Sequence, residues 1–328
     1  MLRIVFMGTP DFAEASLEKL YESGQNIVGV VTNPDKPKGR KMILTPSPVK
    51  EYAIKKGLNI YQPEKIRKNE EFINELKNIN PDLICVVAYG KILPKEVLEI
   101  PKLGCINVHG SLLPKYRGAA PIQWSVINGE KVTGITTMYM DVGMDTGDML
   151  LKEEVKIGED ETTGELWDRL KNIGAELLVK TIEKLEKGEI ERIPQGDEFT
   201  LAPMLTKEMA KIDWNNKTGQ EIKNLVRGLN PIMRAYTFFR NKKIKFWKVN
   251  VINYEKLFDL FTDLAEYSYK LKDIQPGTVM FSGDKNGLFI KAKDSIIEVI
   301  ELQAENSKKM PIREFLRGNE INIGEIFE

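Results

Sequence analysis

The sequence is poor in histidine and cysteine: its 328 residues include one His and two Cys, beside 48 basic and 48 acidic side chains whose charges cancel. It has no CxxC pair and no cluster of His and Cys, so we expect no zinc site and predict no metal. Cys85 and Cys105 both lie in apolar stretches. This placement indicates buried, reduced thiols rather than a disulfide, and favours a cytoplasmic protein.

The chain also lacks long apolar runs and nucleotide-binding motifs. No stretch approaches the roughly 20 apolar residues that a membrane span requires. The opening MLRIVF is typical of a buried strand and has none of the regions of an export signal. GTPDFA, residues 8–13, follows that strand but differs from GxGxxG, and no P-loop occurs, so we expect no dependence on ATP or NAD.

The length and the order of patterns predict two domains. Over residues 1–188 apolar strands alternate with amphipathic helices, which predicts an α/β domain with a Rossmann-like, mostly parallel sheet. The turn-rich residues 189–205 are predicted to connect the domains. Short strands separated by turn signals over 206–328 predict a smaller, OB-like β-barrel. Within it, residues 253–274 are predicted to form a helical insertion.

Charge is unevenly distributed although the net charge is zero. Residues 206–250 contain eleven Lys and Arg against three acids, a local net charge of +8. Such a block points to a polyanion bound by one face, with a solvated surface as the alternative. Five aromatic side chains are interleaved with these cations, and we expect strand alternation to bury most of them rather than offer them for base stacking. They are Tyr236, Phe238, Phe239, Phe246 and Trp247.

The single histidine lies at the end of a predicted strand, GCINVHGS. Side chains alternate along a strand, so Asn107 and His109 share a face near its carboxyl end, where open α/β sheets bind ligands. An Asn amide can stabilise an oxyanion, and an imidazole can carry charge or move a proton. A carboxylate is expected from the glycine-rich loop 141–148, where Asp145 is better placed to reach inward than Asp141 or Asp148.

Three alternatives compete with this interpretation. His109 could be a satisfied core histidine. Ser111 could be the nucleophile of a Ser-His-Asp hydrolase, but no GxSxG elbow is present. Cys105 has no activating cation near it in sequence and lies in an apolar strand, which argues against a nucleophilic role.

Several stretches together resemble the methionyl-tRNA formyltransferases of the folate-dependent formyltransferase family. They are FMGTPDFA, PSPVK, INVHGSLLPKYRGAAPIQW, DVGMDTGDML and, at 205–214, LTKEMAKIDW. The resemblance covers nearly the whole chain. It implies formyl transfer from 10-formyltetrahydrofolate to the α-amino group of methionyl initiator tRNA, in translation initiation, by a monomer. The family's catalytic residues fall on Asn107, His109 and Asp145: the first two would stabilise an oxyanion, and Asp145 would hold His109 charged.

The resemblance also implies binding residues for both substrates. Folate contacts fall on Ser111, Leu112, Leu113 and Pro114, and a pterin wall on Val87, Tyr89 and Ile92, where plain strand and turn packing is the alternative. Residues 33–50 contain four prolines and five cations against one Asp, a composition that excludes a strand or helix interior. The resemblance places tRNA contacts here, on Arg40 with Lys38 and Lys41, against a solvated loop as the alternative.

Two other functions share the same residues. The formyl acceptor could be a sugar-nucleotide amine, glycinamide ribonucleotide or water, although small acceptors need neither a basic loop nor a basic second domain. The chain could also be an RNA-binding protein with a decayed catalytic fold, which the retained Asn107, His109 and Asp145 disfavour.

Overall fold

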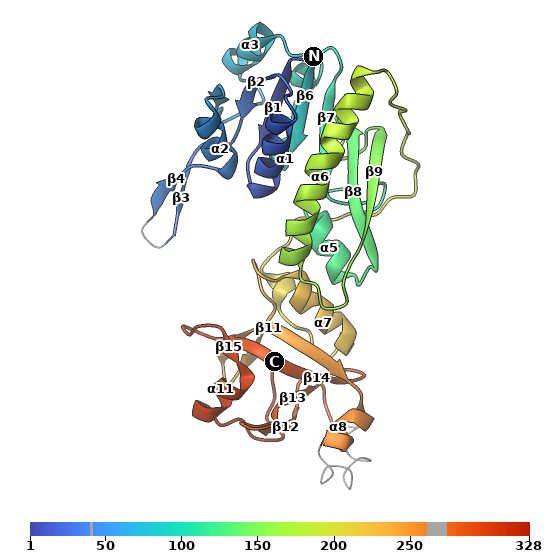
Figure 1. Cartoon of the computed structure of the whole chain (residues 1–328). Helices are drawn as coiled ribbons and strands as arrows, with labels where there is room; N and C mark the ends of the chain where they lie inside the picture. Colours follow the sequence, from blue (N-terminus) through green and yellow to red (C-terminus); the bar gives the residue numbers. More distant parts are fainter. Residues whose placement is uncertain (40–41, 261–273) are drawn as a thin grey trace. The chain divides into compact units, whose positions relative to one another are not determined.

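The computed structural model describes residues 1–39, 42–260 and 274–328 (Figure 1). The chain forms two compact units. The first contains residues 1–122, 132–156 and 165–204, and the second contains 123–131, 157–164 and 205–328. Residues 189–204, predicted to be a linker, therefore belong to the first unit, and two short segments from the first half of the chain belong to the second.

A seven-stranded sheet forms the centre of the first unit, in the order β5-β2-β1-β6-β7-β8-β9. The first five strands in this order pair in parallel, and β8 and β9 run antiparallel at one end. The predicted mostly parallel sheet is thus confirmed. The strands are β1 (Ile4–Gly8), β2 (Ile27–Val31), β5 (Ile60–Tyr61), β6 (Leu83–Val87), β7 (Cys105–His109), β8 (Val132–Tyr139) and β9 (Met149–Lys156).

Helices cover both faces of this sheet. On one face, Gly174 lies so close to Val108 and Phe12 that an added Cβ would meet Val108 Cγ1 at 3.2 Å. On the other face, Cys105 packs in a core with Leu76 and Val97. The helices of this unit are α1 (Asp11–Glu22), α2 (Pro48–Lys56), α3 (Glu70–Ile79), α4 (Lys95–Leu98) and α6 (Thr163–Glu186), whereas most residues of α5 (Pro121–Ile127) belong to the second unit. Because side chains alternate along β7, Asn107 and His109 lie on the face of α3 and α4.

The proline-rich residues 33–50 are more regular than predicted. Strands β3 (Lys36–Lys38) and β4 (Ile43–Thr45) pair as a small antiparallel hairpin, with Pro37 inside it. An isolated two-stranded hairpin tolerates proline because both of its strands are edge strands. Ser47 then caps α2 by accepting a hydrogen bond from the Lys50 amide, and Pro48 occupies the first turn, where no amide hydrogen is needed.

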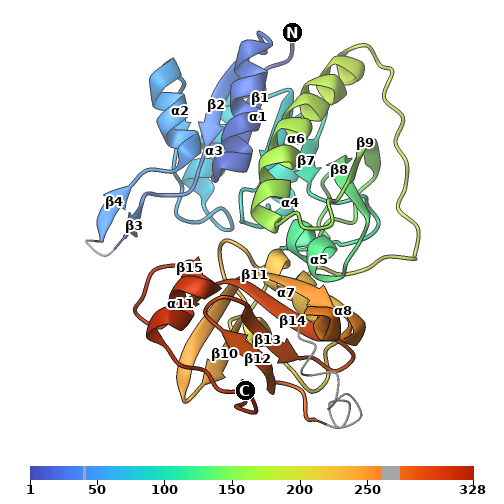
Figure 2. The same cartoon turned by 60° about the horizontal axis from the view of Figure 1, so that its bottom comes forward.

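The second unit is built on an antiparallel sheet in the order β10-β11-β14-β13-β12, with β15 paired to β14 (Figure 2). The C-terminal residues hydrogen-bond to both edge strands: Glu328 pairs with Phe238 of β10, and Glu325 accepts from Val279 of β12. This pairing closes the sheet toward the predicted barrel. The elements are α7 (Gly219–Gly228), β10 (Tyr236–Phe239), β11 (Lys242–Ile252), α8 (Tyr254–Leu260), β12 (Val279–Gly283), β13 (Gly287–Lys291), β14 (Ile296–Ala304), β15 (Met310–Pro311) and α11 (Ile312–Gly318).

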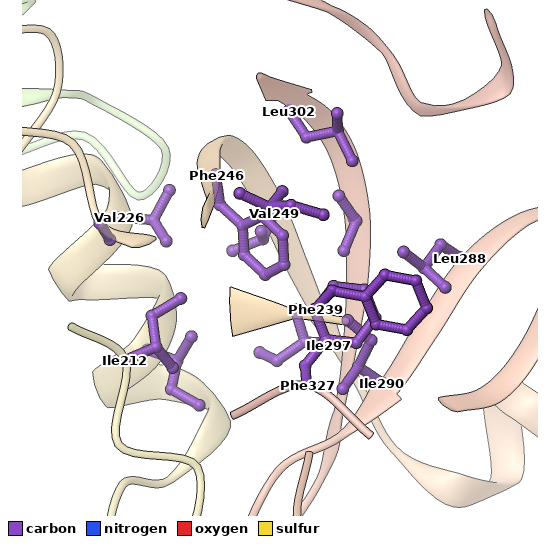
Figure 3. Close-up of a cluster of buried hydrophobic side chains, with 14 of the residues drawn as sticks. Ile212, Val226, Phe239, Phe246, Val249, Leu288, Ile290, Ile297, Leu302 and Phe327 are labelled. Carbon is purple, nitrogen blue, oxygen red and sulfur yellow. The ribbon is translucent and has the colours of Figure 1, made fainter. Parts of the chain in front are cut away.

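Aromatic and branched side chains fill the interior of this unit (Figure 3). Phe239 stacks on Phe327 with ring centroids 4.5 Å apart, and Phe246 is fully buried beside them. Thr218 and Glu221 form a capping box at the start of α7. Of the predicted insertion 253–274, α8 ends at Leu260, and residues 261–273 lie outside the described residues. Over the described ranges, no helix is long and apolar enough to cross a membrane.

Candidate functional site

The candidate catalytic residues meet at the carboxyl end of β7. His109 is 5% exposed and Asn107 is half-buried, and β7 lies between the parallel β6 and the antiparallel β8. Asp145 approaches both: its Oδ2 lies 3.6 Å from His109 Nδ1, and its Oδ1 accepts a long hydrogen bond of 3.5 Å from Asn107 Nδ2. The structure therefore brings together the three residues that the sequence singled out.

The two other acids of the loop 141–148 have different partners. Asp141 accepts hydrogen bonds from the Gly143 amide and the Thr146 hydroxyl within the loop. Asp148 pairs with Arg192 at 2.9 Å. Asp145 is the acid of this loop that faces His109.

The contacts of His109 fix which ring nitrogen carries a proton. Nε2 lies 2.9 Å from the carbonyl oxygen of Tyr116, which can only accept a hydrogen bond, so Nε2 is protonated. Nδ1 then faces the Asp145 carboxylate. A second proton on Nδ1 would turn this contact into an attractive ion pair that includes a buried imidazole. The geometry thus suits an imidazolium whose charge is balanced by Asp145.

The backbone after His109 is held by its own hydrogen bonds. Ser111 donates its hydroxyl hydrogen to the Lys115 carbonyl at 2.6 Å, so the geometry gives no support to a nucleophile activated by His109. Thr136 donates to the Ser111 carbonyl and accepts from the Leu113 amide. Lys152 donates to the Leu113 carbonyl at 2.6 Å, and burial lowers the pKa of Lys152. These bonds fix the segment 111–114 where the resemblance expects folate contacts.

Several side chains of the segment 111–114 and of the predicted pterin wall are buried rather than exposed to a ligand. Leu113 is 1% exposed and packs with other core residues. Val87 and Tyr89 are also buried, which favours plain packing for their side chains, and burial raises the pKa of the Tyr89 hydroxyl. Ile92 is different, because it is 68% exposed.

Ile92 lines a cleft of about 900 Å³ together with Val142, a neighbour of Asp145 in the loop 141–148. Leu93 and Pro94 continue its apolar lining, and Arg67 is among the cations at its edge. The volume is within the range of small-molecule sites. The lining also contains Glu70 and Glu96 beside its cations, so it combines apolar surface that suits a ring system with charges of both signs.

Two of the three predicted tRNA contacts, Arg40 and Lys41, lie outside the described residues. Lys38 ends strand β3, on the same hairpin. Three consecutive apolar residues of the hairpin are more than three-fifths exposed: Met42, Ile43 and Leu44. The base of the hairpin is fixed by Asp35, which accepts from Lys50 at 2.7 Å and from Gln62 at 2.9 Å.

The aromatic residues of the basic window divide into two groups. Phe239 and Phe246 are buried, as predicted, but Tyr236, Phe238 and Trp247 are only half-buried, so that prediction was wrong for these three. Cations lie over their rings: Lys243 Nζ is 3.8 Å from the Tyr236 centroid, and the Arg234 guanidinium is 4.2 Å from that of Trp247. Tyr236 is only partly buried, but it still packs against the core that contains Phe239.

Sequence reasoning missed three groups that hold the site. The Gly118 amide donates to Asp145 Oδ2 at 2.9 Å, and the Tyr116 carbonyl holds His109. Gln195 donates to the carbonyl oxygens of Asp145 and Gly147, both at 2.8 Å. Two of these contacts use backbone atoms, and Gln195 lies in a segment without periodicity, so no sequence pattern marks them.

The sequence and the fold of this chain have counterparts in known proteins. A family model described as formyl transferase matches residues 2–182, and one described as formyl transferase, C-terminal domain matches residues 204–320. The chain therefore belongs to the formyl transferase family.

Curated relatives resemble this chain over almost its whole length. Proteins named methionyl-tRNA formyltransferase are 49% identical in Ruminiclostridium cellulolyticum, over 99% of both chains, and 49% in Caldanaerobacter subterraneus, over 100% of both. Among solved structures, a sugar 3N-formyl transferase, WlaRD, matches 94% of this chain and 99% of its own, with a TM-score of 0.64 and 19% identity. HypX from Aquifex aeolicus with tetrahydrofolic acid matches 98% of this chain and 50% of its own, with a TM-score of 0.59 and 15% identity. At these identities the solved structures support the fold alone.

Proposed function

We propose that this chain transfers a formyl group from 10-formyltetrahydrofolate to the α-amino group of methionyl initiator tRNA, the activity for which its curated relatives are named. The observation that carries the proposal is the meeting of Asn107, His109 and Asp145 at the carboxyl end of β7. Near-complete coverage of relatives at 49% identity supports the same acceptor.

The reaction exchanges one carbon–nitrogen bond for another. The α-amino nitrogen of the methionyl ester bonds to the formyl carbon, and the bond from that carbon to the folate nitrogen breaks. The amine loses one proton and the folate nitrogen gains one, so no oxidant or reductant is required. Negative charge develops on the formyl oxygen as the new bond forms, and a pre-organised donor beside that oxygen lowers the barrier.

The three polar residues can divide this work. The Asn107 amide has two hydrogens, of which one is directed at Asp145, so the other can be donated to the oxyanion. His109 contributes positive charge from a buried position, and Asp145 balances that charge before substrate binds. Because Asp145 also accepts from the Gly118 amide, its carboxylate is fixed and does not have to reorganise.

The cleft lined by Ile92 and Val142 suits a folate. Both side chains offer exposed apolar surface to a ring system, and Val142 belongs to the loop that holds Asp145. The backbone of Ser111 and Leu113, held by Thr136, forms a rigid turn immediately after His109. Cations at the cleft edge suit the carboxylates of the glutamate portion.

The acceptor is proposed to be RNA because cations and aromatic rings lie together on the second unit. Lys243 over Tyr236 and Arg234 over Trp247 combine charge with stacking surface, as single-stranded RNA contacts do. The basic loop with Lys38, Arg40 and Lys41 adds positive charge in the sequence. A small acceptor amine requires neither feature.

Transfer of radiolabelled formyl from 10-formyltetrahydrofolate to methionylated initiator tRNA tests the proposal. We expect labelled tRNA with the wild type and near-background transfer with His109→Ala. Arg40→Ala should impair transfer to tRNA while its melting temperature stays that of the wild type. Label that passes to water or to a small amine but not to tRNA would refute the acceptor, and absence of any folate turnover would refute the reaction. We further propose a cytoplasmic monomer that needs no metal.

A further inference from the structure

Residues 193–202, here called the strap, run past the candidate site. They contact Asp145 and Tyr116, the two residues that hold the His109 ring. The strap joins the unit at one end through Ile193, which exchanges two backbone hydrogen bonds with Met149 of β9. At its other end, Thr200 and Ala202 pair with the backbone of Arg117. Between these anchors, Gln195 is half-buried while the residues on either side of it are exposed.

The Gln195 amide uses all of its hydrogen-bonding groups on the site. Its Nε2 donates to the carbonyl oxygens of Asp145 and Gly147, each at 2.8 Å. Its Oε1 accepts from Arg117 Nε at 2.9 Å. One side chain therefore ties the loop that contains Asp145 to the loop that contains Arg117 and Gly118.

Asp145 needs such support because its backbone is in the left-handed region, with φ of +55°. A residue with a Cβ pays about 1 kcal/mol or more for this conformation, and it persists where surrounding contacts hold it. The Gly118 amide holds the carboxylate, and Gln195 holds the carbonyl of the same residue. Rotation of the peptide would carry the carboxylate away from His109.

The strap also reaches the other side of the histidine. The Tyr116 amide donates to Thr200 Oγ1 at 2.8 Å, and the Tyr116 carbonyl is the partner of His109 Nε2. The Arg117 guanidinium, which donates to Gln195, also lies 4.4 Å from the centroid of the Phe199 ring. Both groups that orient the imidazole are thus connected to one irregular segment.

We propose that Gln195 is a positioning residue for formyl transfer: it holds the backbone of Asp145 so that the carboxylate stays beside His109 Nδ1. The contribution to rate rests on the proposed function, whereas the effect on His109 can be measured in the free protein. Gln195 acts through Asp145 and does not contact the reacting atoms.

The single histidine makes a direct test possible, because nitrogen NMR of the full chain without a histidine tag reports one imidazole. We would compare wild type, Gln195→Met, Gln195→Glu and Asp145→Asn at one fixed pH. Met keeps the length of the side chain without polar atoms. Glu keeps the acceptor for Arg117 and loses both donors. Glu198→Gln, an exposed change on the same strap, is the matched control.

We expect the Nδ1 and Nε2 signals of Gln195→Met and Gln195→Glu to move toward those of Asp145→Asn, and Glu198→Gln to match the wild type. Formyl transfer should fall about tenfold to hundredfold in kcat for both Gln195 variants, with KM for either substrate within about twofold, because misplacement acts on the chemical step. Melting temperatures identify a variant that has lost its fold.

Imidazole signals like those of the wild type in both Gln195 variants would overturn the proposal, even if the rate fell. If the wild type did not formylate tRNA, the proposed function would fail, while the NMR comparison would still decide whether Gln195 positions Asp145. Shifted signals with an unchanged kcat would overturn the role in catalysis.

Discussion

The substitution Gly118→Ala tests whether the contact between the strap and the loop 115–120 supports catalysis. Gly118 has a φ of +127°, and a Cβ built on it would lie 2.6 Å from the carbonyl oxygen of Ala202. That oxygen already accepts from the Ala120 amide, so it is part of a paired backbone and cannot rotate away freely. The Gly118 amide is also the donor that holds Asp145 Oδ2.

The expected cost follows from two separate effects. The backbone conformation alone costs an alanine about 1–3 kcal/mol. Relief of the contact requires the strap to move by roughly 0.5 Å or more, which we expect to cost another ~1–2 kcal/mol through weakened hydrogen bonds. A total of about 2–5 kcal/mol corresponds to a fall in melting temperature of about 4–20 °C for a unit of this size.

The loss of activity of Gly118→Ala should exceed what its loss of stability explains. If the Gly118 amide shifts, Asp145 loses its short donor and His109 loses its fixed counterion, so we expect kcat to fall about tenfold or more in folded protein. The control is Gly57→Ala: Gly57 has a φ of +67°, but nothing lies within 4 Å of its added Cβ. This variant should lose about 1 kcal/mol of stability and keep its kcat. A Gly118→Ala enzyme with wild-type kcat at a temperature where it is folded would refute the reasoning.

Three further predictions address the cleft, the RNA surface and pH. Val142→Asp should raise KM for the folate about tenfold by adding charge to an apolar wall, with KM for tRNA as the control; a change in the tRNA value alone would contradict the placement of the folate. Lys243→Ala should reduce the slope of log affinity for tRNA against log salt by about 0.9 if Lys243 contacts one phosphate, and an unchanged slope would exclude that contact. The Lys50 ammonium, and then Gln62, lower the pKa of Asp35, so its stabilising contribution is complete above the pKa of the unfolded chain and is lost as pH falls through the lower folded value. The difference in melting temperature between wild type and Asp35→Asn should therefore shrink below about pH 4, and a constant difference would contradict the role of the charge.

Much of the fold follows from local pattern because periodicity reports which face of an element is buried. The strand LRIVFMG and the run DLICVVAYG indicated buried parallel strands, and β1 and β6 are buried along their whole lengths. Thr218 and Glu221 indicated a helix start by their spacing alone, and both capping hydrogen bonds are present. The alternation that placed Asn107 and His109 on one face is equally local.

Local pattern fails where contacts join irregular segments. Residues 189–205 looked like a linker because they lack periodicity, yet Gln195 contacts residues about 50 and 78 positions away. Proline content suggested that 33–50 could hold no strand, but both strands of a two-stranded hairpin are edge strands, so Pro37 fits in β3. Strand alternation was expected to bury most of the five aromatic side chains, but Tyr236 and Phe238 are only half-buried, and cations lie over their rings.

Asp145 shows most clearly what local sequence pattern misses. It was selected from the sequence for the flexibility of its loop, whereas in the structure hydrogen bonds hold it in place. The glycines around it suggested a flexible loop from which a carboxylate could reach inward. In the structure Asp145 is held at three points, its two carboxylate oxygens by Asn107 and Gly118 and its carbonyl by Gln195. A counterion for His109 must be fixed before substrate binds if it is to stabilise charge without reorganising. The glycines therefore allow the loop to bend sharply, and hydrogen bonds then hold it in place. One of these bonds comes from Gln195, which lies in a segment to which sequence patterns assigned no role.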